Sequence, residues 1–141
     1  MKLLIGIDTG THTGMAIWDG EHLQLECTTI SKAMLAVLRL ATLHEIVVLY
    51  EDATQRKWFG QTGRERLKGA GSVERDSKIW RDFLKENGIR CKAIAPKDNR
   101  TKLTAQQFKL LTGYKGVTNE HSRDAAMLVY KRNFKQLDYA I

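Results

Sequence analysis

The run Ile46-Val47-Val48-Leu49-Tyr50 most strongly constrains what this chain can fold into. Five consecutive apolar residues, three of them β-branched, predict a strand, and the lack of alternation predicts that both of its faces are buried. A strand covered on both faces is typical of a sheet that lies between layers of helices. The run therefore predicts an α/β fold with residues 46–50 near the centre of the sheet.

Four further segments complete the expected sheet. Residues 3–7 and 15–18 are typical of strands, and an Asp-Gly pair after the second is a hairpin signal before a third strand at residues 22–29. Residues 90–95 are expected to form the last strand. The first three strands are predicted to be antiparallel, and helical crossovers join the later ones. The result is a mixed five-stranded sheet flanked by helices.

Four helices are expected, because apolar residues recur at helical spacing in four segments. Ser31, Ser72 and Thr104 are suitable N-cap residues for three of them, and the last helix is expected to start near Asn119. The expected apolar face after Ser31 is Met34, Leu35, Leu38 and Thr42, and that after Ser72 is Val73, Ile79 or Trp80, Phe83 and Leu84. The short helix after Thr104 carries Phe108 and Leu111. The last helix carries Ala125, Leu128 and Tyr130 and extends to about Phe134. No repeat or linker interrupts residues 1–141, so a single domain is predicted.

The charge of the chain favours a polyanionic partner. A formal net charge of +7 on 141 residues is strongly basic, and nucleic acid is the usual partner of such a surface, although solubility alone is an alternative explanation. No apolar stretch is long enough to cross a membrane, so no membrane association is expected. The two cysteines, Cys27 and Cys91, are predicted to be reduced core thiols in a cytoplasmic protein.

Acidic residues follow the expected strands, where a sheet presents chemistry. Asp8 ends the first strand, Glu51 and Asp52 follow the central strand, and His121 and Asp124 share one face of the last helix. Each feature has an ordinary structural explanation, as a turn residue, a loop start or a first helical turn. Together, these acids can supply the oxygen ligands that Mg²⁺ prefers. Phosphodiester cleavage by two metal ions needs such a convergence of carboxylates.

The segments that carry these acids resemble the RuvC-type Holliday-junction resolvases of the ribonuclease H-like superfamily. IGIDTGTHTGMAIWD resembles their first hairpin, Glu51 after VVLY their second acid, and HSRDAAMLV their last helix. The resemblance implies a ribonuclease H-like fold and a catalytic, metal-binding set of Asp8, Glu51, His121 and Asp124. Glu51 is preferred to Asp52 because it directly continues the apolar run. The resemblance also implies two Mg²⁺ or Mn²⁺ ions per site, and a homodimer that nicks opposed strands of a four-way DNA junction.

Basic and aromatic residues are predicted to bind the DNA, since cations neutralise phosphates and aromatic rings stack on exposed bases. A basic loop whose aromatic residues enter the core is the alternative. Small residues before the helix expected after Ser72 can also admit a phosphate to its N-terminus, or can form a plain turn. The candidate DNA-binding residues are Arg56, Lys57, Trp58, Phe59, Arg64, Arg66, Lys68, Gly69, Gly71, Ser72, Arg75, Lys97 and Arg100, and Lys102 extends the basic track.

The sequence thus favours a metal-dependent endonuclease of branched DNA. Alternatives are a nuclease of the same fold that acts on structured RNA or other DNA, and a DNA-binding module without catalysis. DTGTHTG also resembles the first phosphate loop of sugar kinases and actin-like ATPases. Those proteins need two such domains around the nucleotide and this chain has room for one, so no nucleotide cofactor is expected.

Overall fold

A five-stranded mixed sheet forms the centre of the protein. The computed structural model describes residues 1–52, 64–95 and 102–134, and within residues 64–73 it describes the course of the helix alone. The strands are β1 (Lys2–Asp8), β2 (Thr13–Trp18), β3 (Leu23–Thr28), β4 (Glu45–Glu51) and β5 (Cys91–Ile94). The helices are α1 (Ile30–Leu43), α2 (Arg64–Glu86), α3 (Ala105–Thr112) and α4 (Glu120–Val129).

The strand order is β3-β2-β1-β4-β5. Strands β1, β2 and β3 pair antiparallel, whereas β4 pairs parallel with both β1 and β5. The turn between β2 and β3 forms because the Asp19 carboxylate accepts the backbone N–H groups of Glu21 and His22. Gly20 takes a φ of 103°, which suits glycine. The expected mixed sheet, with three antiparallel strands first, is confirmed.

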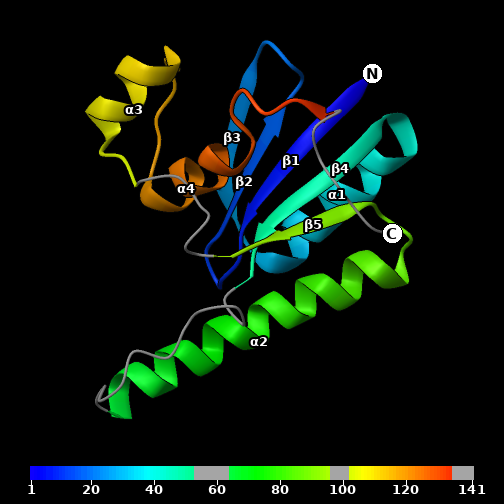
Figure 1. Ribbon diagram of the computed structural model, residues 1–141, viewed down its shortest axis with the longest axis vertical. Coiled ribbons are helices and arrows are strands. Elements are labelled where there is room, and N and C mark those ends of the chain that lie inside the picture. Colours follow the sequence, from blue (N-terminus) through cyan, green and yellow to red (C-terminus); the bar gives the residue numbers. More distant parts are fainter. Residues whose placement is uncertain (53–63, 96–101, 135–141) are drawn as a thin grey trace.

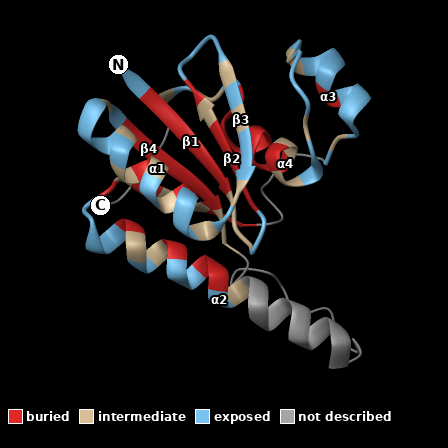
Figure 2. Cartoon of the chain, turned by 180° about the vertical axis from the view of Figure 1, so that it is seen from behind, coloured by how far each residue is buried: buried red, intermediate tan, exposed pale blue. Residues whose placement is uncertain are grey.

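The residues of the central strands belong alternately to two hydrophobic layers. Figure 1 shows the sheet with the helices around it. Val48 and Tyr50 of β4 lie in the layer formed with α1 and α2. Val47 and Leu49 lie in the layer formed with α4, to which α3 contributes the buried Phe108. Figure 2 shows β1 and β4 as buried along most of their length. The unbroken apolar run at residues 46–50 therefore has the predicted cause, since helices cover both faces of that strand.

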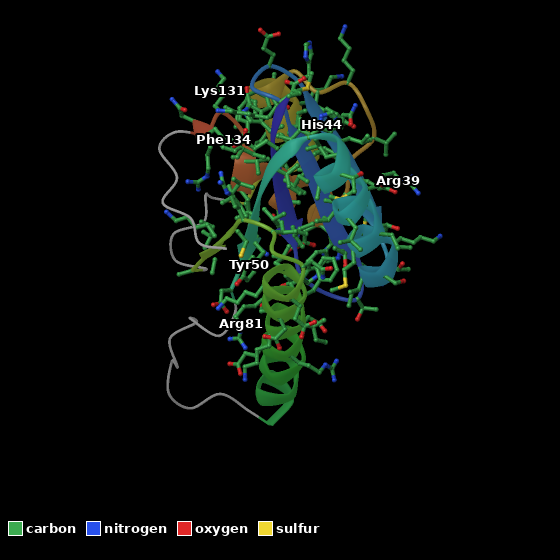
Figure 3. The ribbon with its side chains drawn as sticks, turned by 90° about the vertical axis from the view of Figure 1, so that its right-hand side faces the viewer. Arg39, His44, Tyr50, Arg81, Lys131 and Phe134 are labelled. Carbon is green, nitrogen blue, oxygen red and sulfur yellow. The ribbon has the colours of Figure 1, made fainter. Side chains whose placement is uncertain are left out.

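Helix α2 differs from the expectation at its N-terminal end. It begins at Arg64, so Gly69, Gly71 and Ser72 lie inside the helix. The expected glycine turn, the Ser72 cap and the helix N-terminus that would receive a phosphate there are therefore wrong. A glycine inside a helix costs only about 1 kcal/mol relative to alanine, and the arginines, lysine and glutamate around these glycines are good helix formers. In Figure 3, α2 extends well beyond the sheet from the level of Arg81.

Helix α1 is turned relative to the expected face. Its N-cap is Thr29 rather than Ser31, and Ala33 and Val37 are its buried residues. Met34 and Leu38 pack against this layer as expected, but Leu35 and Thr42 are exposed. Small and β-branched side chains thus carry the closest helix–sheet contact. A periodicity based on large residues alone misses this face.

The smaller expectations have mixed outcomes. In α2, Trp80 and Leu84 are buried as expected, and of the two alternatives Ile79 is the exposed one. Gly88 follows the helix with a φ of 65°. In α3, Phe108 is buried as predicted but Leu111 is exposed. The other departures are that α4 ends at Val129 rather than near Phe134, and that Cys27 is exposed while Cys91 is buried. Among the described residues, no helix is long and apolar enough to cross a membrane.

Candidate active site

Two of the candidate acids end neighbouring parallel strands. Asp8 is the last residue of β1 and Glu51 is the last residue of β4. Because these strands run parallel, with Ile7 opposite Tyr50, the two carboxylates lie at the same edge of the sheet. Asp52 lies just beyond β4, where its backbone N–H donates to the Ile94 carbonyl at 2.8 Å. The choice of Glu51 rather than Asp52 as a member of the site stays a prediction.

Helix α4 brings the other two candidates to this edge. Asn119 caps the helix, because its side-chain oxygen accepts a hydrogen bond from the Ser122 backbone N–H at 2.8 Å. In return, the Asn119 backbone N–H donates to the Ser122 hydroxyl at 3.0 Å. This capping box fixes the first turn, which carries His121. The His121 Nδ1 atom lies 3.0 Å from an Asp8 carboxylate oxygen. Residues 113 positions apart in sequence therefore meet.

Two glycines allow α4 to lie directly on the sheet. A Cβ atom on Gly14 of β2 would clash with the His121 carbonyl oxygen, and one on Gly6 of β1 would clash with the Ala125 carbonyl oxygen. Both clashes involve backbone atoms, which cannot turn aside as a side chain can. Glycine at these two positions therefore sets the distance between the first turn of α4 and the end of β1.

Asp124 has a cationic partner. The Lys102 ammonium lies 3.5 Å from an Asp124 carboxylate oxygen and 3.6 Å from a Glu120 oxygen. Asp124 is largely buried, whereas Lys102 and Glu120 are exposed. Lys102 therefore neutralises part of the negative charge at the site while remaining accessible to solvent.

Burial makes the ionised forms of Asp8 and Asp124 costly. Burial, the largest effect, raises the pKa of Asp8 from 3.8 to about 6, and the His121 contact opposes this rise. The negative charges of Asp124 and Glu51 raise the Asp8 pKa further. Burial likewise raises the pKa of Asp124, although Lys102 opposes it. Carboxyl groups whose ionised form is unfavourable without a bound cation are typical of sites that receive a cation or a proton.

The donor set fits a hard divalent cation. Asp8, Glu51 and Asp124 offer carboxylate oxygens, which Mg²⁺ prefers, and His121 adds a nitrogen. The charges of the three acids act on one another, as the pKa of Asp8 indicates. Within residues 1–52, 64–95 and 102–134, however, no three His, Cys, Asp or Glu side chains already form a metal-binding group. The residues thus suit a divalent ion in their chemistry.

Most of the predicted DNA-binding residues lie where no side chain is described. Arg56, Lys57, Trp58, Phe59, Lys97 and Arg100 fall outside the described residues, and Arg64, Arg66, Lys68, Gly69, Gly71 and Ser72 fall in the part of α2 that is described as a helix alone. Arg75 is described. Its exposed guanidinium Nε lies 3.8 Å from a carboxylate oxygen of the buried Asp76. Their role in DNA binding stays a prediction.

Three neighbours of the site were not predicted from the sequence. The His12 ring stacks on His121, with ring centroids 6.0 Å apart and an interplanar angle of 28°. Lys102 was expected only in a basic track, not against Asp124. Ser77 of α2 lies 3.3 Å from the Thr9 hydroxyl and donates to the Glu51 carbonyl at 3.2 Å. The one available signal for His12 is its place in the turn that follows Asp8.

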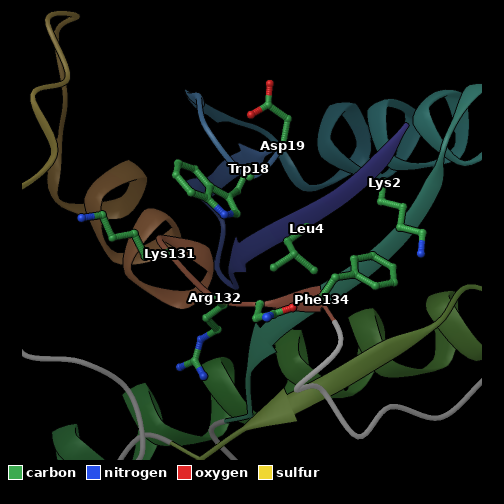
Figure 4. Close-up of a pocket in the computed structure, with 9 residues that line it drawn as sticks. Lys2, Leu4, Trp18, Asp19, Lys131, Arg132 and Phe134 are labelled. Atoms are coloured by element: carbon green, nitrogen blue, oxygen red, sulfur yellow. The ribbon is translucent and has the colours of Figure 1, made fainter.

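A separate hollow lies away from these acids. A cavity of about 430 Å³ opens at the start of β1, where Leu4, Trp18 and Phe134 form an apolar floor (Figure 4). Lys2 lies at its edge with Nζ 5.4 Å from the centre of the Phe134 ring. This is the opposite end of β1 from Asp8.

Comparison with known proteins supports the fold. The solved structure of T. thermophilus RuvC in complex with Holliday junction substrate matches this chain with a TM-score of 0.53 at 18% sequence identity. The match covers 91% of this chain and 90% of the RuvC chain. No protein-family model and no curated protein matches the chain. The fold is ribonuclease H-like, as the sequence resemblance predicted, with the strand order and helices described above.

Proposed function

We propose that this protein is a metal-dependent endonuclease of branched DNA that resolves four-way junctions by paired nicks. The observation that carries the proposal is the convergence at one sheet edge of Asp8, Glu51, His121 and Asp124, which come from β1, β4 and α4. Their charges interact, and Asp8 contacts His121 at 3.0 Å. The ribonuclease H-like fold, shared with a structure that holds a Holliday junction, supports this assignment.

Each residue has a distinct role in the proposed site. Asp8, Glu51 and Asp124 would hold two Mg²⁺ or Mn²⁺ ions, and such ions supply a nucleophile from water and stabilise the leaving oxygen. Asp8 would be the central ligand of the set, because its carboxylate contacts His121 and its pKa responds to the charges of both Asp124 and Glu51. Asp8 also fixes His121 through Nδ1, which leaves Nε2 for an ion or for the proton of the leaving group.

The substrate follows from charge and symmetry. The chain carries a net charge of +7, which favours a polyanion. A four-way junction has approximate two-fold symmetry, so two nicks in opposed strands need two sites related by the same symmetry. We therefore propose that a homodimer is the active form.

The deciding experiment is the cleavage of a labelled synthetic four-way junction in Mg²⁺, Mn²⁺ or EDTA, beside a linear duplex of the same sequence. Paired nicks in the junction alone, dependent on metal, are expected. Asp8→Asn should abolish cleavage and keep junction binding. Asp19→Asn is the matched control, since Asp19 lies in the turn at the other end of β2. Full activity of Asp8→Asn would refute the assignment of the site.

Other outcomes separate the alternatives. Cleavage of a structured RNA in preference to the junction would make this a nuclease of the same fold with another substrate. Tight junction binding that depends strongly on salt, without cleavage in any metal, would indicate a DNA-binding module.

A further inference from the structure

Residues 103–118, here called the arm, form an excursion that carries α3 and returns to the start of α4. In Figure 1, α3 lies apart from the sheet, and Figure 2 shows most of its surface as exposed. The site described above uses no residue of the arm. Its position and its surface therefore need a separate explanation.

The base of the arm is fastened to the catalytic end of α4. Arg123 donates from Nε to the Leu103 carbonyl at 3.1 Å and from Nη1 to the Thr118 hydroxyl at 2.9 Å. One guanidinium thus joins the two ends of the arm. Lys102, the residue just before the arm, contacts Asp124. Both ends of the arm are therefore held beside the candidate active site.

The arm itself has a defined structure. Thr104 and Gln107 form a capping box at the start of α3, and Gly113 ends the helix with a φ of 72°. The buried Phe108 ring packs edge-on against Tyr114. Tyr130, just beyond α4, donates its hydroxyl to the Leu111 carbonyl at 3.2 Å. The side chains on its outer surface are therefore presented by an ordered scaffold, which lowers the entropy cost of a contact.

The arm exposes three large apolar side chains. The exposed fractions are 99% for Val117, 79% for Leu110 and 52% for Leu111. Single exposed apolar residues need no explanation, but several in one short segment beside a site indicate a contact. The arm also contains no Asp or Glu, while Lys109 and Lys115 give it a positive charge. A partner that combines negative charge with exposed apolar faces suits this surface.

We propose that the arm contacts the branch point of the DNA, with Val117 and Leu110 against unstacked bases and the lysines on phosphates. Apolar side chains that wedge between base steps are an established way of holding distorted DNA, and a branch point lowers the cost because its bases are already poorly stacked. The inference rests on the proposed function and deepens it, because it names the element that distinguishes a branch from a linear duplex.

The test compares two double variants of the full chain, Leu110→Ala with Val117→Ala and the control Leu35→Ala with Leu43→Ala. The control residues of α1 are similarly exposed, at 63% and 68%. Binding to a four-way junction and to a linear duplex is measured in EDTA, so that cleavage does not contribute. The junction carries 2-aminopurine at the branch, whose fluorescence rises on unstacking. Val117→Ser alone is a second variant, because its side chain is almost fully exposed and its change cannot disturb the core.

The arm variants should bind the junction about tenfold more weakly, with duplex binding changed less than about twofold and a smaller fluorescence rise. Equal behaviour of arm and control variants would overturn the inference and leave the proposed nuclease intact. The inference would also be overturned if the arm variants changed the oligomeric state of the protein and left DNA binding unaffected, since the arm would then contact protein. A lack of cleavage by the unaltered protein in every metal would overturn the proposed function alone, because the binding comparison in EDTA does not need catalysis.

Discussion

Replacing Asp8 by asparagine should stabilise the ion-free protein at neutral pH, even though Asp8 is a proposed ligand. Burial makes the ionised carboxylate costly, and the charges of Asp124 and Glu51 add to this cost. Asparagine has nearly the same shape, keeps an acceptor for His121 and carries no charge. The variant therefore removes the cost and leaves the packing unchanged.

The magnitude follows from the pKa of Asp8, which rises from 3.8 to about 6 on folding. At about 1.4 kcal/mol for each pKa unit, the ionised form is disfavoured by about 3 kcal/mol in the folded protein. Because the folded-state pKa is the higher one, the neutral carboxyl favours folding below about pH 4, and this advantage is lost as the pH rises to about 6. Asp8→Asn should thus gain about 2 to 3 kcal/mol at pH 8 and almost nothing at pH 4.

Urea denaturation in EDTA at about pH 4, 6 and 8 measures this difference directly. Asp19→Asn is the control of opposite sign, because the backbone N–H groups of His22 and then Glu21 lower the pKa of Asp19. That control should be no more stable than the unaltered protein at pH 8. Added Mg²⁺ should stabilise the unaltered protein and not Asp8→Asn. An Asp8→Asn variant with the same stability gain at pH 4 as at pH 8, or with none, would refute the reasoning.

Three further predictions follow from single contacts. The Lys102→Met variant should bind Mg²⁺ several-fold more tightly in calorimetry, because the Lys102 ammonium, 3.5 Å from Asp124, repels a cation. Unchanged affinity would mean that the ion pair between Lys102 and Asp124 separates without cost. Gly14→Ala should destabilise the protein by about 1 to 3 kcal/mol in urea and lower cleavage, because its Cβ would displace the backbone of His121. Arg123→Ala should speed hydrogen exchange in the arm more than in the sheet, because it frees both ends of the arm; uniform faster exchange would contradict the role of Arg123 as a clamp.

The sheet was predictable because its signals are local. An Asp-Gly turn and short, proline-free apolar runs indicate the strands without knowledge of the rest of the chain. The edge position of Asp8 and Glu51 also follows, since the carboxyl ends of neighbouring parallel strands meet. The start of α2 was not predictable in this way. Gly69 and Gly71 are strong local breaking signals, and the surrounding helix formers outweigh them.

The contacts of the site depend on distances that sequence patterns do not contain. The spacing of His121 and Asp124 placed both on one helical face, but only the fold brings His121 to Asp8 and Lys102 to Asp124. Lys102 precedes the arm, and its position depends on the path by which the chain reaches α3. The stacking of His12 on His121 likewise depends on how closely α4 approaches the β1–β2 turn.

The close approach of α4 to the sheet links the stability of the protein to its proposed chemistry. Gly6 and Gly14 let the backbone of α4 touch β1 and β2, and this contact both places His121 on Asp8 and removes water from the Asp8 carboxylate. The same burial raises the Asp8 pKa, so a site that is well positioned is also one that is unfavourable without added positive charge. If α4 lay farther from the sheet, the Asp8 carboxylate would be better hydrated, and its contact with His121 would be lost. The two glycines therefore indicate that geometry is kept at the expense of stability, which is the usual relation in an active site.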